Sequence, residues 1–108
     1  MKQPIATTNA PGAIGPYSQA IDAGPFVFIS GQIPVNPATG EIPEGIAPQT
    51  AQSIANIKAI LAEAGLTIDN VVKTTVFLAD MNDFGAMNAV YADNFTAPFP
   101  ARSAVAVK

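Results

Sequence analysis

The sequence contains no cysteine and no histidine. Without cysteine, a disulfide framework, a thiol nucleophile and thiolate metal ligands are all excluded. Without histidine, most zinc sites and the most common general base are excluded as well. Any catalysis must therefore use carboxylate, hydroxyl, amine, guanidinium, amide or backbone groups, or a bound water, and we expect no metal site.

Charged residues are scarce. They make up 12% of the 108 residues, and the net charge is −3. Nucleic-acid binding depends on clustered cations, whereas the five cations here are scattered, at Lys2, Lys58, Lys73, Arg102 and Lys108. No apolar stretch approaches the length of a membrane span, and the N-terminus lacks the apolar run of a signal peptide. We therefore expect a cytoplasmic protein with no nucleic-acid partner and no membrane partner.

Apolar residues, by contrast, are abundant. A chain of 108 residues predicts one domain, spanning residues 1–108, with one core. Hydrophobic residues make up 49% of the chain, which is more than one small domain needs for its own core. Because obligate interfaces resemble a core cut in half, this surplus favours contacts between subunits. We expect an oligomer.

The first third of the sequence predicts an arm followed by a hairpin. Residues 3–16 contain three prolines, two glycines and no charge, which is typical of an extended arm with turns. Strands are expected at 17–23 and 26–33, joined through the turn residues 22–25. Residues 26–29 are all apolar, so we expect this part of the second strand to be covered on both faces.

A helix is expected next, from about Pro48 to Gly65. Proline is tolerated in a first turn, and glycine is a suitable left-handed residue at a helix end. The face predicted to be buried consists of residues at helical spacing: Thr50, Ile54, Ile57, Leu61 and Ala64.

The last third predicts a strand, a second helix and a final strand. The strands are expected at 71–78 and 102–107, and the helix is capped by Asp80 or Asn82 and runs to about Phe95. Its buried stripe is predicted to contain Phe84, Tyr91 and Phe95. Helices alternating with strands in a short chain predict an α+β fold in which a mixed sheet has both helices packed on one face.

Arg102 is the strongest functional candidate. It is the only arginine and the only charged residue between Asp93 and Lys108. It opens an apolar strand, where an unpaired charge is costly to bury. The planar guanidinium suits a carboxylate bound through two parallel hydrogen bonds. Two structural alternatives remain open, namely an ion pair with one of the eight acidic residues or a strand end that faces solvent.

Three further positions could bring polar groups to a site. Gly31, between Ser30 and Gln32, permits a ligand to approach backbone N–H groups, although a β-bulge or turn is the alternative. Asn88 lies on the apolar stripe of the second helix, where its amide must bond a ligand, a neighbouring subunit or a strand edge. Tyr17 could donate a hydrogen bond to a ligand, or simply pack.

Four segments carry a resemblance to a known family. They are Ile-Gly-Pro-Tyr-Ser-Gln at 14–19, Ile-Ser-Gly-Gln-Ile-Pro at 29–34, Val-Lys-Thr-Thr-Val-Phe-Leu at 72–78 and Pro-Ala-Arg-Ser-Ala-Val at 100–105. In this order, across nearly the whole chain, they resemble the RidA/YjgF family. The resemblance implies a chorismate-mutase-like α+β fold that forms homotrimers, with three ligand clefts between subunits.

The resemblance also implies roles for individual residues. Arg102 matches the arginine that grips the substrate carboxylate, and Gly31, with Ser30 beside it, matches a backbone contact. Tyr17 and Asn88 match residues that line the cleft, with Tyr17 taking part in catalysis beside Arg102. Many members have a cysteine two residues after the arginine, where this chain has Ala104 at the substrate-binding position.

The family pattern continues past the strand of Arg102 through a turn into a final strand within the sheet. That strand has a glutamate thought to help position the attacking water. This sequence ends at Lys108, so it apparently lacks the family's C-terminal strand, and we expect that the natural chain continues.

The implied activity is hydrolysis of reactive 2-imino acids, 2-iminopropanoate and 2-iminobutanoate, to 2-oxo acids and ammonia. The C=N carbon is already electrophilic, so holding the carboxylate, placing a water and stabilising charge would suffice without a cofactor. The alternative is a non-catalytic module that binds 2-oxo acids or related small carboxylates. Endoribonuclease activity fits the acidic charge poorly, and chorismate mutation needs more than one arginine for its dianion.

Overall fold

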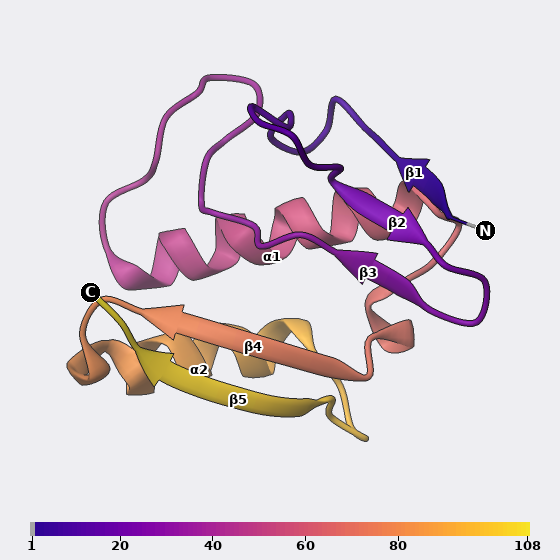
Figure 1. Cartoon of the computed structure of the whole chain (residues 1–108). Helices are drawn as coiled ribbons and strands as arrows, with labels where there is room; N and C mark the ends of the chain where they lie inside the picture. The colour runs from indigo at the N-terminus through magenta and orange to yellow at the C-terminus, as the bar shows by residue number, and fades with distance from the viewer. Residues whose placement is uncertain (1) are drawn as a thin grey trace.

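The computed structural model describes residues 2–108, which contain five strands and two α-helices (Figure 1). The elements are β1 (Gln3–Ile5), β2 (Ala20–Asp22), β3 (Val27–Ile29), α1 (Ile46–Glu63), β4 (Lys73–Leu78), α2 (Phe84–Asn94) and β5 (Ala101–Ala106). Short 3₁₀ helices, η1 (Ile68–Asn70) and η2 (Met81–Asp83), precede β4 and α2. The predicted order of hairpin, helix, strand, helix and strand is confirmed, with β1 as an addition.

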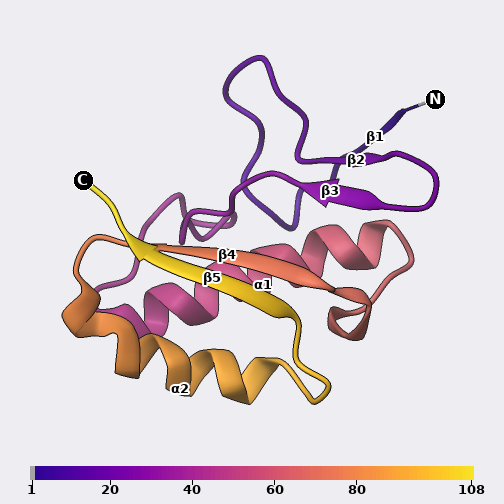
Figure 2. The same ribbon diagram turned by 60° about the horizontal axis from the view of Figure 1, so that its bottom comes forward.

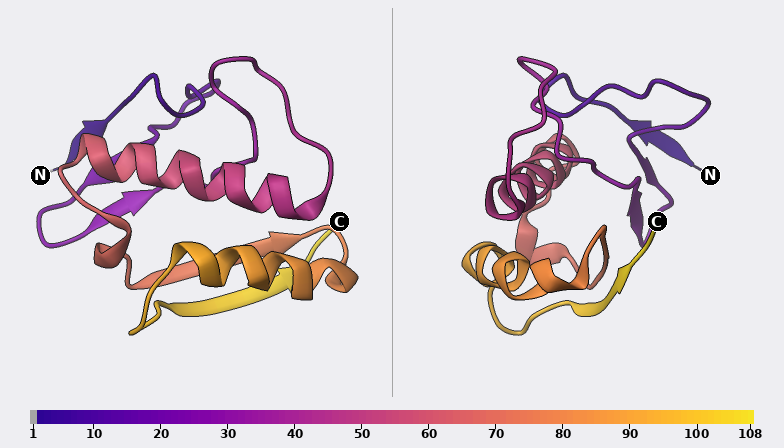
Figure 3. Two further views of the ribbon diagram at one scale, coloured as in Figure 1. Left: turned by 180° about the vertical axis from the view of Figure 1, so that it is seen from behind. Right: turned by 90° about the vertical axis from the view of Figure 1, so that its left-hand side faces the viewer.

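The strands form two separate ladders. In one, β1, β2 and β3 are antiparallel, and in the other β4 and β5 are parallel. The α+β class is confirmed, and the two helices lie together on one side of the strands (Figure 3). Among the described residues, the strands of the expected mixed sheet form an antiparallel and a parallel ladder, and no strand pairs with both.

The hairpin of β2 and β3 is shorter than predicted. Its turn is built as expected: Gly24 has φ +96°, its N–H donates to the Asp22 carboxylate, and the Ala23 N–H donates to the Phe26 carbonyl. Regular pairing ends at Ala20, because the chain before it bends at Gly15, Pro16 and Gln19, and the Tyr17 N–H donates to the Gly15 carbonyl. Part of the expected arm forms β1 instead, since Pro4 is tolerated in an edge strand.

Helix α1 ends where the sequence predicts. Gly65 has φ +74°, and its N–H donates to the Ala62 carbonyl while the Leu66 N–H donates to the Leu61 carbonyl. These two bonds form a Schellman motif, which satisfies carbonyls at the helix end. The helix begins at Ile46, two residues earlier than Pro48, so the proline still lies in the first turn.

The buried face of α1 is wider than the predicted stripe. Ile54 and Leu61 are buried as expected, but the fully buried Ile60 was missed. The reason is that α1 contributes to two apolar clusters. Ile54 packs with Leu78 of β4, with Met87 and Tyr91 of α2, and with Phe95 directly after α2. Ile60 packs with Ala10 and Ala20 beneath the three-stranded sheet. One helix therefore supports both ladders.

Several large apolar side chains lie on open faces of the strands. Phe28 of β3 is 65% exposed, so the expectation that this strand is covered on both faces is wrong for the single chain. Phe77 of β4 is 66% exposed, and its register partner Val105 on β5 is exposed too. These faces point away from the helices because side chains alternate along a strand.

No helix in the described residues is long and apolar enough to cross a membrane.

Candidate functional site

The alternation of side chains along β5 directs Arg102 toward α2. Arg102 and Ala104 are half-buried, whereas Ala101 and Ser103 between and beside them are exposed. This pattern has the two-residue period of a strand with one covered face. Arg102 and Ala104, two of the predicted site residues, therefore share the helix-facing side of β5.

The guanidinium of Arg102 lies against the polar and aromatic side chains of α2. Nη1 donates to Asn88 Oδ1 at 2.6 Å. The Cζ atom lies 4.7 Å from the centre of the Tyr91 ring and 5.4 Å from the centre of the Phe84 ring. Both distances are within the range of cation–π attraction. The structure thus brings Asn88 and Arg102 together, as the sequence predicted for one site.

Arg102 forms no ion pair within the described part of the chain, and the Asn88 amide is its one hydrogen-bond partner there. The first structural alternative, an ion pair with an acidic residue, is therefore not what the chain uses. The bond to Asn88 engages Nη1 and leaves the Nε–Nη2 edge of the guanidinium without a described acceptor. This edge presents two parallel N–H groups, the arrangement that a carboxylate accepts.

An open hollow of about 530 Å³ adjoins the guanidinium. Its walls are formed by α2 and by the segment that leads into β5: Asn88, Tyr91, Ala92, Phe99, Pro100 and Arg102. The hollow therefore combines one cation and one amide with an apolar wall. A small carboxylate with an apolar side chain matches this combination of groups.

The remaining predicted residues form a second group, at the end of β3 and in the β1–β2 connection. Ser30 Oγ donates to the Ser18 carbonyl at 2.6 Å, and the Ser30 N–H donates to the Gln19 carbonyl. Gly31 follows directly and is exposed, and Tyr17 is 50% exposed. The β1–β2 connection lies at the opposite end of the molecule from α2 (Figures 1 and 2). None of Tyr17, Ser30 and Gly31 lines the hollow beside Arg102.

Sequence reasoning missed two buried amides that shape this second group. Gln19 Oε1 accepts from the Thr7 N–H, and its Nε2 donates to the carbonyls of Thr7, Ala10 and Pro11. Asn56 Nδ2 donates to the carbonyls of Ile33 and Val35, just after Gly31. The available signal for Asn56 was its spacing of four residues from Ile60 on α1.

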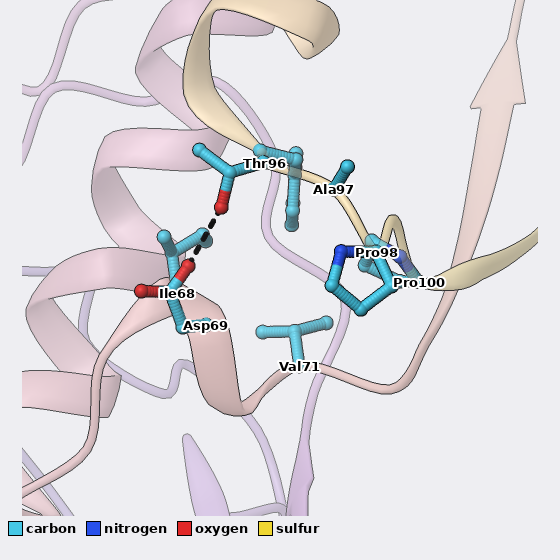
Figure 4. Close-up of a pocket in the computed structure, with 8 residues that line it drawn as sticks. Ile68, Asp69, Val71, Thr96, Ala97, Pro98 and Pro100 are labelled. Carbon is cyan, nitrogen blue, oxygen red and sulfur yellow. Dashed lines mark hydrogen bonds between the residues drawn. The ribbon is translucent and has the colours of Figure 1, made fainter.

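A second hollow of about 190 Å³ lies between η1 and the segment that follows α2 (Figure 4). Thr96 Oγ1 donates to Asp69 Oδ1 at 2.9 Å, and the other walls come from apolar residues such as Val71 and Pro98. Asp69 is the only charged side chain that lines it, and a carboxylate would repel an anionic ligand. This hollow does not fit a 2-imino acid.

Within residues 2–108, no group of three or more acidic side chains is placed to hold a metal ion. The chemistry available around Arg102 is therefore that of a guanidinium, an amide and aromatic rings. Fold and hollow together define a class: small α+β proteins in which a β–α–β unit presents a single arginine beside an open, partly apolar hollow.

Comparison with known proteins identifies the family within this class. A family model described as Endoribonuclease L-PSP matches residues 7–108. The chain is 56% identical over 110 residues to a 2-iminobutanoate/2-iminopropanoate deaminase of Escherichia coli, covering 99% of this chain and 86% of that protein. It is 59% identical over 108 residues to a RutC family protein of Pyrococcus horikoshii, with the same two shares covered.

Solved structures of the same family also match this chain. The crystal structure of the YjgF gene product of Escherichia coli matches with a TM-score of 0.94 at 56% identity, covering 97% of this chain and 85% of that one. A Rid family protein of Yersinia pestis matches with a TM-score of 0.96 at 50% identity, covering 99% and 86%. The chain belongs to the RidA/YjgF (L-PSP) family, which confirms the resemblance seen in its four sequence motifs.

Proposed function

We propose that this protein is an imine deaminase that hydrolyses 2-iminobutanoate and 2-iminopropanoate to the 2-oxo acids and ammonia. The observation that carries the proposal is the guanidinium of Arg102, which has no ion-pair partner in the described chain and borders an open hollow. The identity of 56% to deaminases with this substrate, over 99% of the chain, supports the same reaction.

The Arg102 guanidinium holds the substrate carboxylate through the Nε–Nη2 edge, because Nη1 already donates to Asn88. Two parallel hydrogen bonds fix the plane of the carboxylate and, with it, the position of the adjacent C=N carbon. The side chain of the substrate then lies along the apolar wall at Ala92, Phe99 and Pro100. Ala104 lies on the same face of β5, and the family resemblance assigns it to substrate binding.

Water adds to the imine carbon, and the resulting carbinolamine loses ammonia to give the 2-oxo acid. The carbon is already electrophilic, so positioning and charge stabilisation supply most of the acceleration. Tyr17 can donate a hydrogen bond to the reacting groups, and the backbone at Gly31 can contact them. Ser30 holds this segment in place through its bond to the Ser18 carbonyl.

The two groups of site residues lie in different parts of one chain, so a complete site requires two copies. In a homotrimer, each cleft takes Arg102 and Asn88 from one subunit and Tyr17, Ser30 and Gly31 from its neighbour. The exposed apolar side chains on the strands, such as Phe28 and Phe77, supply surface for such contacts. The trimer and this division of residues are part of the proposal.

The alternative is a module that binds 2-oxo acids without turnover. A coupled assay separates the two functions: threonine dehydratase generates 2-iminobutanoate, and release of 2-oxobutanoate is followed with this protein at a small fraction of the total imine. An enzyme accelerates release over many molecules of imine per chain. Release at the rate of the dehydratase alone would exclude turnover and favour the binding function, which calorimetry with 2-oxobutanoate then tests.

The description of the matching family model names an endoribonuclease. The net charge of −3 and the scattered cations do not support RNA as the substrate here. The cytoplasmic location expected from the sequence stays a prediction.

A further inference from the structure

We propose that Tyr91 is the positioning residue for the Arg102 guanidinium, and that Thr74 fixes Tyr91 in that role. The inference rests on the proposed function, in which Arg102 binds the substrate carboxylate. Tyr91 itself does not need to contact the substrate. It determines where the Nε–Nη2 edge of the guanidinium lies.

The three residues form a closed ring of contacts. Thr74 on β4 and Arg102 on β5 are register partners in the parallel ladder. The Thr74 and Tyr91 hydroxyls are hydrogen-bonded at 2.7 Å, and the Tyr91 ring lies under Arg102 Cζ at 4.7 Å. Tyr91 therefore contacts both strands of the ladder: its hydroxyl bonds Thr74 on β4, and the face of its ring lies against Arg102 on β5.

The aromatic ring of Tyr91 is also fixed from the core side. Tyr91 is 8% exposed and stacks on Phe95 with ring centres 4.2 Å apart and planes at 21°. A tyrosine held by stacking on one side and by a hydroxyl bond at its tip has little freedom to move. The guanidinium that rests on it gains a defined surface.

Asn88 alone would not orient the guanidinium. One hydrogen bond to Nη1 leaves the group able to rotate about that contact, and arginine has a long side chain with many rotamers. A flat aromatic face adds a second constraint, because guanidinium groups stack on such faces. Of the described aromatic residues, Phe84 and Tyr91 lie within cation–π range of Arg102, and the Tyr91 ring is the nearer.

Phe95 provides a matched control. It is buried in the same cluster as Tyr91, and no cation–π contact joins it to Arg102. Tyr91→Leu and Phe95→Leu each replace a buried aromatic ring by an aliphatic side chain. Only the first removes the surface beneath the guanidinium. Tyr91→Phe keeps the ring and removes the bond to Thr74, as does Thr74→Val from the other partner.

The test measures binding of 2-oxobutanoate, the product carboxylate, to the full chain by isothermal titration calorimetry. Thermal unfolding on the same samples establishes that each variant is folded. We expect Tyr91→Leu to weaken binding about five-fold or more, because the apparent affinity falls with the fraction of guanidinium conformers that present the Nε–Nη2 edge. Phe95→Leu, which keeps the Tyr91 ring beneath the guanidinium and removes only the stacking behind it, should lose clearly less affinity than Tyr91→Leu. Tyr91→Phe should lose about two-fold, as Thr74→Val does, because both break the same hydrogen bond.

Kinetics give a second readout that core packing alone would not move. In the coupled assay, the loss in Tyr91→Leu should appear mainly as a raised KM, because the carboxylate contact exists in both ground and transition states. If Tyr91→Leu does not fold, Thr74→Val replaces it. We then expect about a two-fold or greater loss of affinity, with no further loss when Tyr91→Phe is added, because both remove one hydrogen bond.

Equal binding by Tyr91→Leu and Phe95→Leu would overturn the positioning role, as would unchanged binding in Thr74→Val. The proposed function fails separately. If Arg102→Ala binds 2-oxobutanoate as tightly as the unmodified protein, then Arg102 is not the carboxylate-binding residue, whatever Tyr91 does. If Arg102→Ala loses binding while Tyr91→Leu and Phe95→Leu have equal affinity for 2-oxobutanoate, only the role of Tyr91 is refuted.

Discussion

Replacing Arg102 by alanine removes the group on which the proposed chemistry depends. A charged, bidentate partner in a partly desolvated site contributes about 2–5 kcal/mol to ligand binding. Each 1.36 kcal/mol corresponds to a factor of ten, so kcat/KM for 2-iminobutanoate should fall by roughly thirty-fold to several thousand-fold. Arg102→Lys should restore part of this loss, because an ammonium keeps the charge but not the planar pair of N–H groups.

The same change should leave the fold intact. Within the described chain, Arg102 contacts one amide and two aromatic rings. Asn88 is half-buried and borders the hollow, so water can reach its carbonyl oxygen once the guanidinium is gone. Cation–π contacts are worth about 0.5–2 kcal/mol each, depending on how far they are desolvated, and the stability of a small domain is about 5–15 kcal/mol.

The assay couples threonine dehydratase to release of 2-oxobutanoate and checks the assembly state of each variant by light scattering. Arg102→Ala protein that is folded and assembled, yet hydrolyses the imine at close to the unmodified rate, would refute the reasoning. Arg102 would then be a structural residue at the start of β5.

Three further outcomes are expected. Asn88→Asp places a carboxylate where the amide oxygen lies 2.6 Å from Arg102 Nη1, so it should compete with the substrate and raise KM about ten-fold or more in the coupled assay; an unchanged KM would argue against the contact. Gly65→Ala forces a side chain into the left-handed region at φ +74° and should lower the free energy of unfolding, measured in urea, by about 1–2 kcal/mol. Gly12→Ala is the control and should lower it less, because a Cβ there meets nothing within 4 Å and Gly12 has no positive φ. Equal urea midpoints for the two variants would contradict this expectation. Light scattering of the protein at micromolar concentration should give the mass of a trimer, and a monomer would contradict the proposed division of the site between two copies.

Local signals predicted both helices and their C-terminal ends. The C-terminal end of α1 at Gly65 follows from the need of a helix for a left-handed residue there, and the chain adopts this geometry. Such features depend on a few neighbouring residues, which is why a sequence reveals them. The expectation that Asp80 or Asn82 caps the second helix is wrong: the N-cap of α2 is Asp83, which makes no side-chain cap bond, and Asp80 instead caps the preceding η2 turn, where its carboxylate accepts from the Asn82 N–H.

Features that depend on distant contacts were predicted less well. The strands predicted before and after the hairpin turn are longer than β2 and β3, because alternation of apolar residues does not show where backbone pairing stops. The buried face of α1 was assigned as one stripe, since nothing in the sequence indicated that the helix serves two clusters. The residues of β3 and β4 likewise do not indicate whether a further strand pairs with either of them.

The candidate site was predicted in part. Arg102 was a candidate because it is the one charged residue in an apolar strand, and helical spacing placed Asn88 on the stripe of α2 that faces Arg102. Tyr91 was assigned to the core, which is correct, but its place beneath the guanidinium required the packing of α2 on β5. No local pattern separates Tyr17, Ser30 and Gly31 from Arg102, so their position in another part of the chain emerged only from the fold.

Paired removal of the two charges that the proposal joins tests its central claim most directly. Dissociation constants are measured by calorimetry for 2-oxobutanoate and for 2-oxobutanamide, which lacks the carboxylate, with the unmodified protein and with Arg102→Ala. If Arg102 binds the carboxylate, the unmodified protein should prefer the acid roughly thirty-fold or more, and this preference should collapse in Arg102→Ala. An equal preference for the acid in both proteins would show that the carboxylate binds elsewhere.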